Sequence, residues 1–282
     1  MRKLIVFLFV SLVLNASFMP VPDATNTVSA DARLERHITG IYRQIDFSRN
    51  DRLPYEVFSK AYHGYLNLRQ AGKLNVNNEI LTICDFDLPS TQNRMWILDL
   101  AKKTVLFNNL VAHGQGTGED CAEAFSNKPN SHQSSLGFYV TGETYDGEHG
   151  LSLRLVGMDE GFNDAAFDRD IVVHGAPYVC TKYICENDRL GRSWGCPAVP
   201  EKLSAPIINT IKDSTCLFIY FPDHKYLASS QWLNKKPGSL PEGDMMAGLL
   251  TTQQAMKPTP KVRIIQYVDK NGHIDSTKTI PY

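Results

Sequence analysis

A cysteine in a tight turn and a histidine 22 residues before it are the best candidates for covalent chemistry in this sequence. Cys196 lies within residues 193–198 (SWGCPA), between a glycine and a proline, and His174 follows the apolar run 171–173 (IVV). The thiolate is the attacking form of cysteine, and a nearby imidazole accepts the thiol proton and later protonates a leaving amine. The spacing therefore predicts a strand that ends in a base, a connecting segment, and a turn that exposes a nucleophile.

The turn also contains Ser193 and Gly195, which we group with Cys196 and His174 as catalytic candidates. A glycine beside the nucleophile lets a substrate carbonyl approach the backbone and leaves N–H groups available for an oxyanion. The alternatives are that Ser193 and Gly195 only shape the turn, that Cys196 is a structural cysteine or half of a disulfide, and that His174 is a strand-end histidine whose hydrogen bonds are satisfied.

Five further residues are candidates for substrate binding: His113, Arg169, Gly175, Arg192 and Trp194. The two arginines would pair with a substrate carboxylate, because a guanidinium group matches carboxylate geometry; the alternative for each is a surface salt bridge. His113 either lines the substrate cleft or is an ordinary loop histidine. Gly175 and Trp194 are included because they adjoin the base and the nucleophile.

We expect no metal and no cofactor. A zinc site built from His174, Cys180, Cys185 and Cys196 would lack the Cys-x-x-Cys spacing of common zinc sites. Residues 114–120 (GQGTGED) do not form a nucleotide loop, because the lysine and Ser/Thr of a P-loop are missing.

Taken together, these motifs resemble the catalytic domain of the L,D-transpeptidases, also called the YkuD domain. That family carries His-Gly at a strand end and then Ser/Thr-His-Gly-Cys, which correspond here to residues 174–175 (HG) and 193–196 (SWGC). The resemblance covers about residues 78–222 and is closest to the branch called the murein L,D-transpeptidase catalytic domain. Members of that branch carry similar versions of four blocks: 111–114 (VAHG), 125–127 (FSN), 134–137 (SSLG) and 191–199 (GRSWGCPAV).

The sequence departs from the family at three positions. Trp194 stands where many members have histidine, and Pro197 and Ala198 follow the cysteine where many have an apolar residue and then arginine or asparagine. In those relatives the polar residue helps to hold substrate near the thiol, so the peptide that this chain accepts is left open.

The resemblance implies a cysteine acyltransferase of the cell envelope that acts on peptidoglycan stem peptides and forms cross-links through a Cys196 thioester. It also implies a backbone carbonyl that orients His174, an oxyanion hole at the Cys196 amide and its neighbours, and acylation by carbapenems. With water as acceptor, the same chemistry would be that of an L,D-carboxypeptidase. A non-catalytic wall-binding or scaffold protein on the same fold is the alternative from another class, and a general thiol protease is a third.

The hydrophobic pattern predicts a mainly β fold, a β-sandwich or partly closed barrel, with an N-terminal helical extension and a C-terminal β-hairpin. Residues 31–72 have helical spacing in two segments, with Pro54 opening the second. From residue 78 the pattern changes to short strands separated by turns, without βαβ alternation. The expected strands are residues 80–86, 94–100, 104–112, 136–141, 151–156, 171–174 and 217–221.

These patterns predict four segments. Residues 1–22 are an export signal or an uncleaved N-terminal anchor, since Arg2 and Lys3 precede a short apolar run. Residues 23–77 form the helical extension and residues 78–222 the catalytic domain. Residues 223–282 contain a hairpin whose strands, 262–268 and 274–280, flank a DKNG turn.

The net charge and the predicted export signal limit which binding partners and which compartment are expected. The net charge of −1 gives no basis for binding nucleic acid, and a membrane is expected only through an uncleaved N-terminal segment. Export implies the periplasm or cell envelope, an oxidising compartment. We therefore expect Cys180 and Cys185 to form a disulfide that stiffens the cleft wall and leaves Cys196 free. Pairing of either with Cys196 would instead block the nucleophile and make a redox switch. The oligomeric state is left open.

Overall fold

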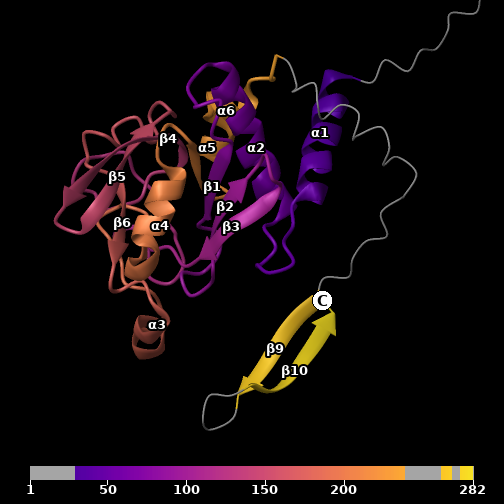
Figure 1. Cartoon of the computed structure of the whole chain (residues 1–282). Coiled ribbons are helices and arrows are strands. Elements are labelled where there is room, and N and C mark those ends of the chain that lie inside the picture. Colours follow the sequence, from indigo (N-terminus) through magenta and orange to yellow (C-terminus); the bar gives the residue numbers. More distant parts are fainter. Residues whose placement is uncertain (1–28, 239–261, 269–273, 282) are drawn as a thin grey trace, which may run out of the picture.

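The computed structural model describes residues 29–238 and the strand backbone at 262–268 and 274–281 (Figure 1). The predicted export signal, residues 1–22, lies outside the described residues. Within the described part of the chain, no helix is both long enough and apolar enough to cross a membrane.

Two N-terminal helices form where the sequence predicts them. Helix α1 spans Ala30–Gln44 and helix α2 spans Tyr55–Gln70, with Pro54 at the N-cap of α2. The apolar face of α1 is buried, and α2 packs against the central strands of the sheet. One hydrophobic core runs without interruption from the helices into the sheet. The division between a helical extension and a catalytic domain stays a prediction.

The central feature is an eight-stranded mixed sheet with the order β3-β2-β1-β8-β4-β5-β6-β7. The β1–β8 and β6–β7 pairs are parallel and the other pairs are antiparallel. The strands are β1 Ile80–Asp85, β2 Met95–Asp99, β3 Thr104–Asn109, β4 Gly137–Gly147, β5 Gly150–Gly157, β6 Val172–Ala176, β7 Ala198–Pro200 and β8 Cys216–Tyr220. Every residue of β1, β2 and β8 is buried, which explains why these strands read as continuous apolar runs.

The two edges of the sheet approach each other. Ala112, just beyond β3, forms an antiparallel bridge with Ala198 of β7. The first and last strands of the sheet order are thereby linked through the segment that follows β3. The predicted mainly β fold with a partly closed barrel is confirmed, and so are its N-terminal helices.

The connections contain helices that the sequence pattern did not indicate. Helix α3 (Thr181–Asn187) joins the parallel strands β6 and β7, so the expectation of no βαβ unit is wrong at this point. It buries no residue, and therefore shows no apolar periodicity. Helix α4 (Glu201–Ile211) packs on β6 and contains Pro206, which interrupts the helical pattern. Two short helices, α5 (His224–Ser229) and α6 (Gln231–Asn234), follow β8.

The C-terminal strands form the predicted hairpin. Strand β9 (Val262–Val268) pairs antiparallel with β10 (Ile274–Pro281). The DKNG turn between them lies outside the described residues.

Candidate active site

The cysteine turn is held by its own serine. The Ser193 hydroxyl donates to the Cys196 carbonyl at 2.6 Å and accepts the Gly195 amide at 3.1 Å. Gly195 has φ +125°, and a Cβ there would lie 2.7 Å from the Gln133 carbonyl oxygen. Only glycine fits this conformation without strain. Within the described residues, the amides of Trp194 and Cys196 donate to no backbone carbonyl, so both are available to an oxyanion.

Two segments far away in sequence fix the outer side of the turn. The Ser193 amide donates to the His113 carbonyl at 3.0 Å, and the Gln115 amide donates to the Ser193 carbonyl at 2.8 Å. The Ser134 hydroxyl donates to the Gly195 carbonyl at 3.0 Å and accepts the Gly114 amide at 3.0 Å. The sequence blocks around residues 111–114 and 134–137 therefore act as a frame for the turn.

His113 lies behind this frame and not in the cleft. Its Nδ1 accepts from the buried Arg94 at 2.8 Å, and its Nε2–H donates to the Glu119 carbonyl at 3.1 Å. Burial, followed by the charge of Arg94, lowers the pKa of His113 to about 4. It is thus a neutral histidine that ties Arg94 to the loop after residue 114.

Cys196 is partly buried at the base of a cleft of about 570 Å³. Its Sγ donates to the Asp170 carbonyl at 3.6 Å and accepts the Val172 amide at 3.4 Å. Burial raises the pKa of this thiol to about 11, while the Val172 amide and the charge of Arg169 oppose the rise. The resting cysteine is therefore a neutral thiol.

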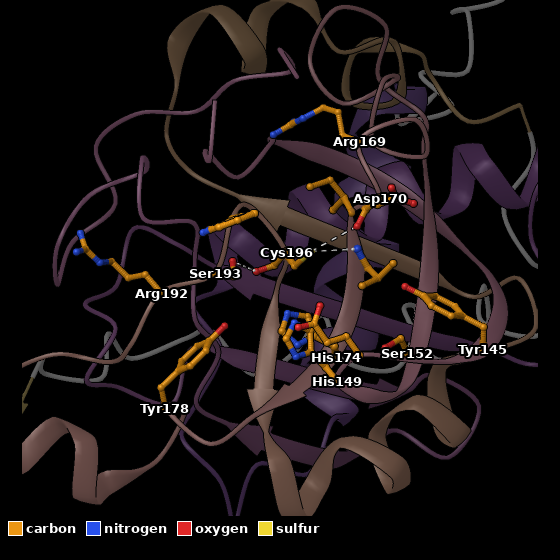
Figure 2. A pocket seen from close by; sticks show the side chains of 14 residues that line it. Tyr145, His149, Ser152, Arg169, Asp170, His174, Tyr178, Arg192, Ser193 and Cys196 are labelled. Carbon is orange, nitrogen blue, oxygen red and sulfur yellow. Dashed lines mark hydrogen bonds between the residues drawn. The ribbon is translucent and has the colours of Figure 1, made fainter. Parts of the chain in front are cut away.

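His174 lines the same cleft, at the middle of β6 (Figure 2). Its Nδ1–H donates to the Gly175 carbonyl at 3.0 Å. That bond places the proton on Nδ1 and leaves Nε2 as the basic nitrogen. Burial lowers the pKa of His174, and the neighbouring His149 lowers it further. The imidazole is consequently neutral at rest, with Nε2 unprotonated.

His149 is a cleft residue that the sequence pattern did not reveal. It comes from the turn between β4 and β5 and stacks on His174, with ring centroids 4.5 Å apart and planes at 22°. Tyr145, Asp170 and Tyr178 also line the cleft (Figure 2). No spacing relates these residues to Cys196, because loops and strand pairing bring them there.

The two arginines have different environments. Arg192 lines the cleft but forms an ion pair with Glu119 at 2.7 Å. Arg169 forms no ion pair within the described residues, and its terminal nitrogens donate to neutral oxygens of residues 126–135. Its charge lies close enough to Cys196 to lower the pKa of the thiol. The guanidinium of Arg169 therefore both braces the 126–135 loop and favours the thiolate.

The remaining candidates are Gly175 and Trp194. A Cβ on Gly175 would lie 2.8 Å from the Ser204 side chain, so this glycine lets α4 pack against β6. Trp194 lines the cleft with 71% of its surface exposed, and stacks on His132. Of the sequence candidates, Cys196, His174, Ser193, Arg169, Arg192 and Trp194 line one cleft, whereas His113, Gly175 and Gly195 do not.

The predicted disulfide is absent. All six cysteines lie among the described residues and all six are free thiols. Cys180 caps α3, where its Sγ accepts the Tyr183 amide at 3.4 Å, and Cys185 lies in the body of the helix and is exposed. The Cys180 sulfur is thus used to cap a helix that the sequence did not indicate. In the described part of the chain, no cluster of three or more His, Cys, Asp or Glu residues is arranged to hold a metal.

Comparison with known proteins places the chain in a family. The model of the L,D-transpeptidase catalytic domain matches residues 49–220. No curated protein matches the sequence. Among solved structures, the chain is similar to an L,D-transpeptidase from Mycobacterium smegmatis, with 13% identity, a TM-score of 0.32, and coverage of 51% of this chain and 59% of that one.

Two further structures come from Mycobacterium tuberculosis. An L,D-transpeptidase of strain H37Rv has 12% identity and a TM-score of 0.30, with 50% of this chain and 57% of that chain covered. L,D-transpeptidase 3 with a faropenem-derived adduct has 12% identity and a TM-score of 0.30, with coverage of 50% and 60%. The chain thus spans less than two thirds of the length of these structures. Because the family model covers more than half of the sequence, the chain belongs to the L,D-transpeptidase catalytic domain family.

Proposed function

We propose that this protein is an exported L,D-transpeptidase of the cell envelope that cross-links peptidoglycan stem peptides through a thioester on Cys196. The observation that carries the proposal is that Cys196 and His174 line one cleft, with the His174 tautomer set by the Gly175 carbonyl. Membership in the family supports peptidoglycan as the substrate class. The periplasm or cell envelope is part of the same proposal.

Acylation begins with proton transfer from the Cys196 thiol to His174 Nε2. The thiolate attacks the carbonyl carbon at the bond between an L-configured centre of the stem and the following D-residue. The oxyanion that forms is stabilised by the free amides of the 193–196 turn. When the C–N bond breaks, the departing amine takes the proton from His174 and the acyl group stays on sulfur.

Deacylation follows the same path in reverse. The side-chain amine of a second stem attacks the thioester and gives a proton to His174. The C–S bond then breaks, and the thiolate recovers that proton. A new amide joins the two stems, and the enzyme returns to its neutral pair. Water in place of the amine would release the acyl group as a carboxylic acid, which is the L,D-carboxypeptidase reaction.

The raised pKa of Cys196 has a kinetic consequence for the first step. At neutral pH the free enzyme contains mostly thiol, so the proton moves as substrate enters the cleft. We therefore expect alkylation of Cys196 by iodoacetamide to be slow at pH 7 and to accelerate steadily toward alkaline pH. A strong nucleophile at rest, with maximal alkylation already at pH 7, would contradict this account.

The decisive test uses purified protein and a disaccharide-tetrapeptide, with products identified by mass spectrometry. A cross-linked dimer that has lost one D-residue is expected from wild type, and no turnover is expected from Cys196→Ala. Cys185→Ala is the matched control, because this thiol is exposed and lies outside the cleft. Trimmed monomer alone would favour the carboxypeptidase, and an unchanged substrate would favour a scaffold protein.

A carbapenem provides a second readout of the same thiol. One covalent adduct on Cys196 is expected by intact mass, with penicillins reacting poorly, and Cys196→Ala should acquire none. An adduct on another residue would remove Cys196 as the acylated nucleophile.

A further inference from the structure

Beside the catalytic cleft lies a second cavity of about 230 Å³, which we call the side pocket. Its lining includes Asn130, His132, Asp168 and Trp194. It also shares Arg169, Asp170 and Trp194 with the cleft, so the two cavities are contiguous across the Trp194 ring. The reaction described above assigns no role to the side chains of Asn130, His132 and Asp168, which line only the side pocket.

The indole of Trp194 is held as a rigid platform. It stacks on the imidazole of His132 with ring centroids 4.8 Å apart and planes at 2°. The His132 ring accepts from the Gln115 side chain at 3.1 Å, and the His132 carbonyl accepts the Gly116 amide at 2.9 Å. One indole face is therefore covered by a fixed neighbour, while 71% of the side chain stays exposed.

Backbone strain supports this platform. His132 has φ +53° and Asn130 has φ +58°, both in the left-handed region that non-glycine residues rarely adopt. Such conformations persist where the surrounding structure fixes them, and they gather at ligand sites. Two of the residues that line the side pocket are therefore held in an uncommon backbone conformation.

The polar groups that line the side pocket indicate which kind of ligand fits it. Asp168 offers a carboxylate acceptor and Asn130 offers both a donor and an acceptor, whereas the Asp170 carboxylate pairs with Arg154 at 3.3 Å. The terminal nitrogens of Arg169 are already used by residues 126–135, so the pocket presents little to an anion. An aromatic face bordered by acceptors suits a neutral ring that has an apolar face and hydroxyl donors at its edge. The cavity is smaller than the roughly 300 Å³ at which pockets for drug-sized ligands begin, which fits one ring.

We infer that the side pocket is a subsite for an N-acetylated amino sugar of the glycan strand that carries the stem peptide. The inference rests on the proposed function, because the stem in the catalytic cleft is what brings its sugar to Trp194. The sugar ring stacks on the exposed face of Trp194, and its hydroxyl and N-acetyl groups bond to Asn130 and Asp168. The subsite would let the enzyme distinguish stems on a glycan from free peptides.

The test measures binding and does not depend on turnover. Cys196→Ala protein is titrated calorimetrically with disaccharide-tetrapeptide, with the free tetrapeptide, and with a tetramer of N-acetylglucosamine. The disaccharide-tetrapeptide should bind about 2- to 12-fold more tightly than the free tetrapeptide, the ratio expected if a sugar ring on the indole contributes as much as a second aromatic ring would, about 0.5–1.5 kcal/mol. The sugar tetramer alone should bind saturably.

Variants locate the effect. Adding Trp194→Ala should abolish the advantage of the disaccharide-tetrapeptide and the binding of the tetramer, and His132→Ala should reduce both. Phe167→Ala is the matched control, because Phe167 is an aromatic residue with 48% exposure that lines neither cavity. Trp194→Phe, which keeps an aromatic face, should retain most of the advantage.

Several results would overturn the subsite. The first is equal affinity for the disaccharide-tetrapeptide and the free tetrapeptide. The second is tighter binding of the disaccharide-tetrapeptide that persists in Trp194→Ala. The third is a loss of affinity for the free tetrapeptide in Trp194→Ala that is as large as the loss for the disaccharide-tetrapeptide. The last result would assign the platform to peptide. Failure of the proposed function is recognised separately, by an absence of products from the wild-type enzyme while the sugar tetramer still binds through Trp194.

Discussion

His149, on the turn between β4 and β5, stacks on His174, the proposed base, and influences its pKa. A charge on His149 lowers the pKa of His174, in addition to the larger effect of burial. Below its pKa, His174 is protonated and cannot accept the thiol proton. In the proposed reaction, the low-pH limit of activity therefore depends on both rings.

We expect His149→Gln to raise the pKa of His174, because the neighbouring positive charge is removed. The acidic limb of the kcat/KM profile should shift to higher pH, since this limb reports the free enzyme. The exposed His224 lies outside the cleft, so His224→Gln serves as the control and should leave the profile in place. A limb that moves to lower pH in His149→Gln would contradict the coupling.

Arg169 is the second residue that influences the titration of another side chain, since its charge lowers the pKa of Cys196. Arg169→Gln should raise this pKa and slow alkylation of the thiol at a fixed pH of about 9. Arg169→Lys keeps the charge but loses the fork of hydrogen bonds to residues 126–135. If the two variants slow alkylation equally, the role of Arg169 is only to hold the loop.

The sequence pointed to Cys196 and His174 as candidates because glycine, proline and an apolar run mark their local structure, and the structure brings both to one cleft. It offered no sign that Arg169 influences the thiol or that His149 stacks on His174. Those relations arise from the 126–135 loop and the β4–β5 turn, which fold against the site from elsewhere in the chain. The same is true of the frame that Ser134 and His113 provide for the turn.

Among the elements, helix α2 has a glycine where it meets the sheet. A Cβ on Gly64 would lie 2.0 Å from the Phe138 ring, which itself stacks on Phe218 with centroids 4.2 Å apart. The close approach of α2 to β4 and β8 therefore requires the smallest side chain. By contrast, Gly40 of α1 has no atom within 4 Å of the position of an added Cβ.

Gly64→Ala is expected to lower the free energy of unfolding. Overpacking costs about 1–3 kcal/mol, against a gain of at most about 1 kcal/mol from helix propensity. Gly40→Ala makes the matched comparison and should stabilise by up to about 1 kcal/mol, because it gains propensity without a clash. Urea unfolding measures both. Stabilisation by both substitutions would show that α2 is not pressed against Phe138.

Strands and long helices were predictable because burial leaves a period in the sequence. The strands β1, β2 and β8 appear as apolar runs, and α1 shows spacings of three and four. Helix α3 leaves no such mark, because it buries nothing, and α4 is obscured by Pro206. The expected disulfide failed for this reason, since its geometry depended on a helix without a sequence signal.

For the molecule as a whole, two buried groups near Arg94 affect stability in opposite directions as the pH changes. Burial raises the pKa of Asp85 to about 7 and lowers the pKa of His113 to about 4. Between pH 4 and 7 the unfolded chain releases the Asp85 proton before the folded chain does, so this group lowers stability as the pH rises. Over nearly the same range the unfolded chain binds the His113 proton and the folded chain does not, so that group raises stability with pH.

The two effects oppose each other in the wild type, and single substitutions should expose each slope. Asp85→Asn should make the free energy of unfolding rise with pH between about 4 and 6.5, the interval between the folded and unfolded pKa values of His113. His113→Gln should make the free energy of unfolding fall with pH between about 4 and 7, the interval between the unfolded and folded pKa values of Asp85. Urea unfolding at a series of pH values provides the measurement, and equal slopes in the two variants would refute the assignment.

The Trp194–His132 stack also gives the protein an intrinsic optical signal. Trp96 and Trp232 are buried, with 1% and 8% exposure, whereas Trp194 is 71% exposed. Its indole emission should therefore lie at longer wavelength than that of the other two. Fluorescence excited at the red edge would thus report on the surroundings of this one indole, and it would follow any molecule that settles on the indole face, without a label or a chromogenic substrate.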